Sequence, residues 1–242
     1  MKKLLLISML FSCVSFSSNG QILISLLLGD KVNSDSLEFG LVGGINMTET
    51  SGLENSKMMG EWNLGFYFDF MITDKWSFTP ACLVKASVGA KSLSPYALGE
   101  NYLDSVMVGG EVRRNLGYFQ VPLMMKYKII PRIHVAIGPQ LSLLHSATDL
   151  FTNDVISSND VAFKNDIKKQ YKRLDAGVIA GIGWALKKEK KSMNLGVKYY
   201  QGMVNVVKDK SLHKQKNNSI YFYITIPIGA GKNKGKDTSP GN

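Results

Sequence analysis

The chain is poor in cysteine and histidine, and its apolar residues are dispersed. Two cysteines, Cys13 and Cys82, occur in 242 residues. Only Cys82 lies outside the N-terminal leader, so we expect no internal disulfide in the mature protein. The three histidines show no spacing typical of a metal site. The mean hydropathy of −0.02 excludes a bundle of membrane-spanning helices.

The N-terminus has the layout of a secretory signal peptide. Two lysines precede an apolar run from Leu4 to about Phe16, and small residues stand before Gln21. We therefore expect residues 1–20 to be a signal peptide. The alternative is a lipoprotein signal that leads to lipidation of Cys13.

Eight segments alternate apolar and polar residues with a period of two. In Ser219–Ile228 every even position is Ile or Phe, whereas the odd positions are Ser, Tyr, Thr or Pro. Such alternation indicates β-strands with one apolar face. The expected strands are 37–47, 61–72, 76–88, 117–129, 132–145, 173–186, 193–206 and 219–228.

The connections between these segments are alternately very short and long, beginning with the long segment 48–60 and the short segment 73–75. Outer-membrane barrels have short periplasmic turns and long extracellular loops, and an even strand number leaves both termini in the periplasm. The sequence therefore predicts an all-β fold, an eight-stranded antiparallel up-and-down transmembrane β-barrel.

A lipocalin-like secreted carrier would show the same alternation with its apolar face inward. Two features favour the membrane barrel. Most strand glycines, including Gly40, Gly44, Gly177 and Gly183, share the polar face, where a narrow lumen needs small residues. Aromatic residues lie on the apolar face near strand ends, as in the girdles at membrane interfaces. The expected girdle is Trp62, Trp76, Trp184, Phe39, Phe70, Phe119 and Tyr127.

With the strands placed, the chain resembles the PorT-like family of bacterial outer-membrane β-barrels. The matching stretches are residues 38–46 (EFGLVGGIN), 87–91 (SVGAK), 117–123 (GYFQVPL), Gly138-Pro139 and 198–202 (KYYQG) with Asn205. The resemblance covers residues 37–228 and implies an outer-membrane barrel, with accessory roles in secretion or gliding for a few members.

The domain layout follows from these segments. Residues 21–36 are expected to be a periplasmic N-terminal segment, 37–228 the barrel, and 229–242 a basic periplasmic tail. A net charge of +10 could indicate nucleic-acid binding, but for a secreted protein it favours contact with anionic lipid head groups. The basic segment Val161–Arg173 is expected to contact the phosphates of lipopolysaccharide. Other expected partners are outer-membrane lipids, the barrel-assembly machinery, and envelope or secretion proteins.

Charged residues of both signs fall on the expected lumenal face. We expect them to pair and fill the lumen, because an unpaired buried charge costs several kcal/mol. The alternative is a narrow polar conduit or a small-anion site near Lys126 and Lys198. The expected lumenal charge network is Glu38, Asp69, Lys85, Lys126, Lys128, Asp175 and Lys198.

His145-Ser146, at the end of the fifth expected strand, raises the question of a hydrolase triad. Alternation directs the two side chains to opposite faces, and Asp149 reaches them only if the loop curls back, so we expect no catalytic residues and no cofactor. The leading prediction is a non-enzymatic structural or interaction protein of the outer membrane, with secretion or envelope assembly as its setting. The second is a small transporter of apolar solutes, and the third is a lipid-modifying enzyme.

Overall fold

Antiparallel strands account for most of the chain in a computed structural model, which describes residues 36–153, 161–188, 192–209, 211 and 213–228. The expected segments 1–20 and 229–242, and most of 21–36, lie outside the described residues. Within the described part, no helix is long and apolar enough to cross a membrane. The elements are β1 (Leu37–Ser51), β2 (Met59–Met71), β3 (Trp76–Leu93), α3 (Asn101–Val106), β4 (Glu111–Ile130), β5 (Ile133–Asn153), β6 (Val161–Asp166), the 3-10 turn η1 (Lys168–Gln170), β7 (Leu174–Ala185), β8 (Asn194–Gly202) and β9 (Lys216–Pro227).

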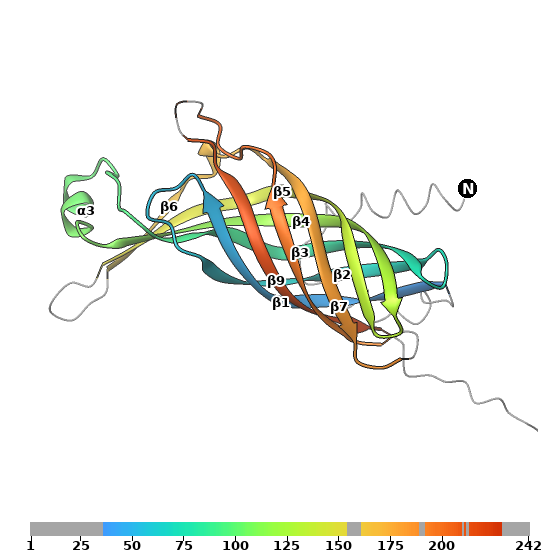
Figure 1. Ribbon diagram of the computed structural model, residues 1–242. Coiled ribbons are helices and arrows are strands. Elements are labelled where there is room, and N and C mark those ends of the chain that lie inside the picture. The colour runs from blue at the N-terminus through green and yellow to red at the C-terminus, as the bar shows by residue number, and fades with distance from the viewer. Residues whose placement is uncertain (1–35, 154–160, 189–191, 210, 212, 229–242) are drawn as a thin grey trace, which may run out of the picture.

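Eight of these strands close into a ring (Figure 1). Each strand of the ring pairs antiparallel with the next strand of the ring, and β5 pairs directly with β7 because β6 is not part of the ring. Pairing of β1 with β9 joins the first strand to the last. The short β6 lies outside the ring and pairs with the distal part of β5. The predicted eight-stranded antiparallel barrel is confirmed.

The last strand shows how the sequence pattern becomes two faces. Ser219 and Tyr221 are almost fully buried, whereas Phe222 is 51% exposed and Ile226 is 41% exposed. Successive side chains of a strand point to opposite sides of the sheet, so the apolar positions of β9 face outward. This orientation is opposite to that of a lipocalin-like carrier.

The two ends of the barrel differ in the length of their connections. The turn end carries connections 72–75, 131–132 and 186–193. The loop end carries 52–58, 94–110, 154–173 and 203–215, with α3 and β6 among them. Figure 1 shows the segment around α3 projecting beyond the ring at this end.

Strands β3, β4 and β5 extend further past the loop end than predicted. In β4, charged residues such as Arg113 and Arg114 interrupt the apolar alternation, so the pattern predicted that this strand begins only at Gly117. The extensions nevertheless pair with one another and form a small core of their own. Its buried members are Ala90, Leu93, Met107, Val112 and Phe151.

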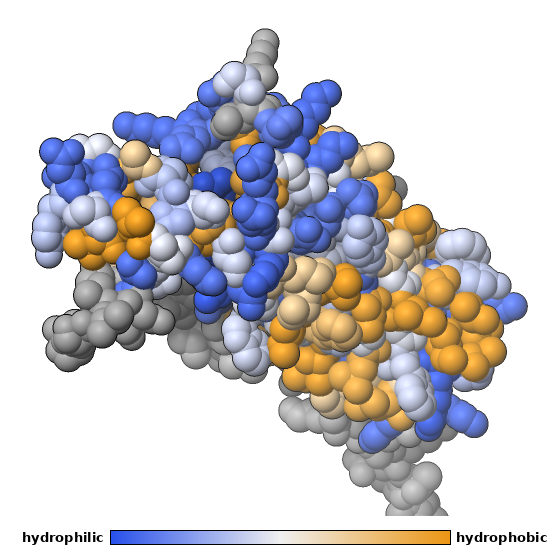
Figure 2. Space-filling view, turned by 60° about the vertical axis from the view of Figure 1, so that its left-hand side comes forward, coloured by the Kyte–Doolittle hydropathy of each residue, from blue (hydrophilic) through white to orange (hydrophobic). Residues whose placement is uncertain are grey.

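Apolar side chains form the outer surface of the ring. Figure 2 shows hydrophobic residues gathered over one half of the molecule and mostly hydrophilic residues over the other. Apolar side chains that are more than a third exposed occur on strands around the ring, among them Ile45, Leu64, Ile137, Leu141, Ile182, Leu195 and Phe222. A contiguous apolar belt of this kind needs a nonaqueous surrounding.

Candidate functional site

The interior of the barrel begins at the turn end with a polar layer. Lys126 of β4 forms an ion pair with Asp69 of β2, and their side chains are 20% and 14% exposed. The Tyr67 hydroxyl, also on β2, donates a hydrogen bond to Glu38 Oε1 on the neighbouring β1 at 2.5 Å. The structure thus brings three of the seven predicted lumenal charges into direct polar contacts in one layer.

Lys198 has an aromatic partner rather than a carboxylate. Its Nζ lies 4.1 Å from the centroid of the Tyr223 ring, in a cation–π contact. Gly183 and Gly196 make room for this ring, since a Cβ at either position would collide with Tyr223. These lumenal glycines are therefore needed because the Tyr223 side chain occupies the space where a Cβ would lie.

A layer of buried amides and phenols lies in the middle of the barrel. Asp175 is 2% exposed, and its Oδ2 accepts a hydrogen bond from Asn217 Nδ2 at 2.9 Å. Tyr221 donates to Gln120 Oε1 across the lumen at 3.0 Å. The sequence identified Asp175 as lumenal, but these neutral partners were overlooked. Gln120 and Tyr221 lie on the polar face of predicted strands, whereas Asn217 precedes the predicted start of the last strand at Ser219.

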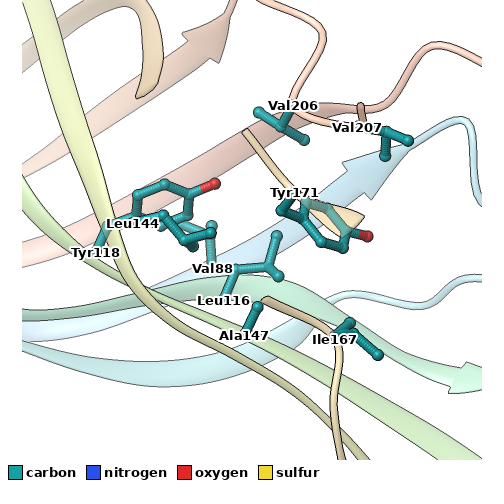
Figure 3. Packing of buried hydrophobic residues seen from close by; sticks show 9 residues of the cluster. All are labelled: Val88, Leu116, Tyr118, Leu144, Ala147, Ile167, Tyr171, Val206 and Val207. Atoms are coloured by element: carbon teal, nitrogen blue, oxygen red, sulfur yellow. The ribbon is translucent and has the colours of Figure 1, made fainter. Parts of the chain in front are cut away.

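Apolar side chains fill the interior near the loop end (Figure 3). Leu116, Tyr118 and Leu144 project inward from β4 and β5 and are no more than 2% exposed. Connecting segments add Tyr171 and Val206, which are equally buried. We call this group the loop-end plug, and its members are Val88, Leu116, Tyr118, Leu144, Ala147, Ile167, Tyr171, Val206 and Val207.

A hydrogen-bonded cluster covers the plug. The Arg114 guanidinium binds both carboxylate oxygens of Asp149, at 2.8 and 2.6 Å, and donates to the Tyr171 hydroxyl at 3.0 Å. Tyr171 in turn donates to Gln215 Oε1 at 2.8 Å. Tyr96 donates to Asp149 Oδ2, and burial together with the nearby carboxylate raises the pKa of Tyr96 to about 12. The loop-end connections are thereby tied to the ring.

Lys85 does not face the lumen as predicted. A register shift in β3 separates the pair Leu83–Gln120 from the pair Ala86–Tyr118. This β-bulge adds a residue to one strand and reverses the alternation beyond it. Lys85 is consequently exposed, and Ala86 takes the inward position. Lys128, by contrast, is an exposed residue at the turn end, where it lines a cavity.

Residues 30–208 match the family described as outer membrane protein beta-barrel domain. The chain belongs to this family. The protein is therefore an outer-membrane β-barrel, and its apolar belt faces lipid. A search of the curated proteins finds no match.

Solved outer-membrane barrels are similar to the chain at low sequence identity. The attachment invasion locus protein Ail of Yersinia pestis, solved with the heparin analogue sucrose octasulfate, is 8% identical, with 80% of this chain and 99% of that chain covered and a TM-score of 0.41. Neisserial surface protein A is 10% identical, with 78% and 97% covered and a TM-score of 0.43. OprG from Pseudomonas aeruginosa is 10% identical, with 79% and 94% covered and a TM-score of 0.37.

In this outer-membrane barrel the predicted girdle residues take two kinds of position. Trp62, Trp184, Trp76 and Phe119 are 67%, 57%, 45% and 37% exposed on the outer wall. Trp76 packs on Tyr127 with ring centroids 4.7 Å apart, and Phe70 stacks on Phe78. Phe39 is only 8% exposed, because Phe66 and Phe68 pack against it.

The rim residues His145 and Ser146 do not point to opposite faces, contrary to the prediction. A second bulge, between the pairs Gly117–Ser146 and Tyr118–Leu144, makes His145 the extra residue. A Cβ on the outward-facing Gly117 would touch both His145 and Ser146, so both lie on the outer side. Asp149 lies inward, bound to Arg114. The carboxylate that a triad would require is therefore turned away from the histidine.

Proposed function

We propose that the protein is a non-enzymatic structural or interaction component of the outer membrane with a closed lumen. The observation that carries this proposal is the loop-end plug inside the barrel, whose residues are at most 2% exposed. An eight-stranded barrel has an interior that side chains can fill, so no wide aqueous path is expected.

The loop end, by the general orientation of such barrels, faces the exterior. Exposed cations gather there on two connections. Lys208 donates from Nζ to the Lys169 carbonyl at 2.8 Å, and Lys168 and Arg173 are exposed nearby in the chain. Lysine and arginine groups bind phosphate oxygens through charge-assisted hydrogen bonds. The cluster supports contact with lipopolysaccharide phosphates, and the projecting segment around α3 supports contact with an envelope or secretion protein.

We also propose that the protein is related to the PorT-like barrels and that a signal peptide is cleaved from its N-terminus. The stretch 117–123 lies in β4, where Tyr118 and Gln120 are lumenal and fully buried. A mature N-terminus at Gln21, measured by mass spectrometry of the outer-membrane fraction, is the expected product of signal-peptide cleavage. The barrel-assembly machinery is the expected partner during insertion.

Conductance measurements test the closed lumen. The purified barrel should form no stable channel in planar bilayers, and liposomes that contain it should not take up hydrophilic sugars. Ohmic conductance that persists after the lumenal charges are removed would contradict the closed lumen and favour the small-transporter alternative. Uptake of apolar solutes without ion conductance would favour the same alternative.

A further inference from the structure

The turn end of the barrel contains a cavity of about 110 Å³ that the closed-lumen function does not use. A single water needs about 10–15 Å³ of such volume, so a group several times larger than water fits. The Lys126–Asp69 pair lines the cavity, which is bordered by the ends of β1, β2, β3, β4, β5, β7 and β8. We call it the turn-end vestibule.

Positive charge predominates in the vestibule. Five cationic side chains line it, against three carboxylates. The cationic residues are Lys75, Lys126, Lys128, Arg132 and Lys188, and the carboxylates belong to Glu38, Asp69 and Asp74.

These charged side chains differ in whether an ion pair or a hydrogen bond engages them. Among the described residues, Lys126 is the only one of these cations in an ion pair, and its partner Asp69 is thereby neutralised. Glu38 accepts the hydrogen bond of Tyr67. Arg132 Nε and Asp69 Oδ1 are each buried without a hydrogen-bond partner in the described part of the chain. A buried N–H donor without an acceptor is unfavourable.

We propose that the turn-end vestibule is a binding site for a phosphate-type anion, with Arg132 and Lys128 as its principal ligands. The planar guanidinium presents a fork of donors that matches phosphate oxygens, and the lysines supply compact charges around it. The ion pair with Lys126 offsets the charge of Asp69, and the four remaining cations outnumber the two remaining carboxylates, Glu38 and Asp74. The vestibule opens at the end that faces the periplasm in such barrels.

Two sources can supply this chemistry, namely free phosphate and the phosphodiester of a periplasmic-leaflet phospholipid. The exposed Trp76 and Trp184 lie at the same end and mark the level of the head groups. The site is defined by the phosphate chemistry in both cases, and the experiment separates the sources.

Calorimetric titration of the full barrel, folded in a non-ionic detergent free of phospholipid, tests the site with inorganic phosphate. Saturable binding is expected, and Arg132→Gln should weaken it at least tenfold. Lys128→Gln is a second variant in case Arg132→Gln does not fold, as judged by heat-modifiable gel mobility. Lys91→Gln is the matched control, because it removes an exposed charge from the loop end.

A second titration uses micelles doped with short-chain phosphatidylglycerol. Displacement of bound phosphate by this lipid assigns the site to head groups, and undisturbed binding assigns it to soluble phosphate. The proposal is overturned if neither titrant binds saturably. It is equally overturned if both vestibule variants bind like the wild type, or if Lys91→Gln weakens binding as much as they do.

Discussion

The buried pair of Arg114 and Asp149 gives the sharpest prediction about stability. Asp149 is fully buried and accepts three hydrogen bonds, two from Arg114 and one from Tyr96. Arg114→Met would leave only the phenol as a donor to a buried carboxylate. Removing one partner of a buried ion pair costs about 3–5 kcal/mol. We expect a loss of this size in the free energy of unfolding.

Arg113 supplies a matched control on the same strand. It pairs with Glu61 at 2.6 Å, but its side chain is 48% exposed. An exposed ion pair contributes about 0–1 kcal/mol, so Arg113→Met should have a correspondingly small effect. The measurement is urea unfolding in phospholipid vesicles, followed by tryptophan fluorescence and by the heat-modifiable band on gels.

The double variant Arg114→Met with Asp149→Leu separates charge burial from lost packing. Replacing both members of a buried pair by apolar residues is often neutral, so much of the lost stability should return. Equal losses for Arg114→Met and Arg113→Met would refute the assignment of Asp149 as a buried charge that depends on Arg114. A double variant no more stable than Arg114→Met would refute the electrostatic explanation.

Three further predictions concern the wall and the lumen. Ile224→Arg places a charge on the lipid face, where it should lower the free energy of unfolding by about 2–4 kcal/mol near the midplane. The lumenal Thr225→Lys should lower it less, and the reverse order would show that the faces of β9 are misassigned. Lys126→Met should lower the free energy of unfolding by up to about 3–5 kcal/mol, because Asp69 loses its ion-pair partner, and it should open no channel. The added change Asp69→Leu should restore part of this free energy of unfolding. Gly183→Ala should destabilise the barrel by about 1–3 kcal/mol through collision with lumenal rings, measured by the same urea unfolding, and a neutral effect would contradict the close packing there.

The sequence by itself determined the architecture and the membrane-facing side. Side chains of a strand alternate with a period of two whatever the strand packs against, so the pattern in Ser219–Ile228 specified a face before any neighbour was known. The alternation of short and long connections likewise determined an up-and-down order, and the distribution of glycines indicated which side was crowded. Residues such as Gly183 proved to lie under lumenal rings.

Only the tertiary structure decided where the alternation breaks and which groups meet. The bulges at Lys85 and at His145 depend on the register between neighbouring strands, which a single strand's pattern does not contain. The partners of the lumenal charges depend on the stagger around the closed ring, which joined Lys126 to Asp69 but gave Lys198 an aromatic ring. The loop-end plug unites segments distant in sequence, such as Tyr171 and Leu116, because packing in three dimensions, and not local periodicity, covers the mouth of the barrel.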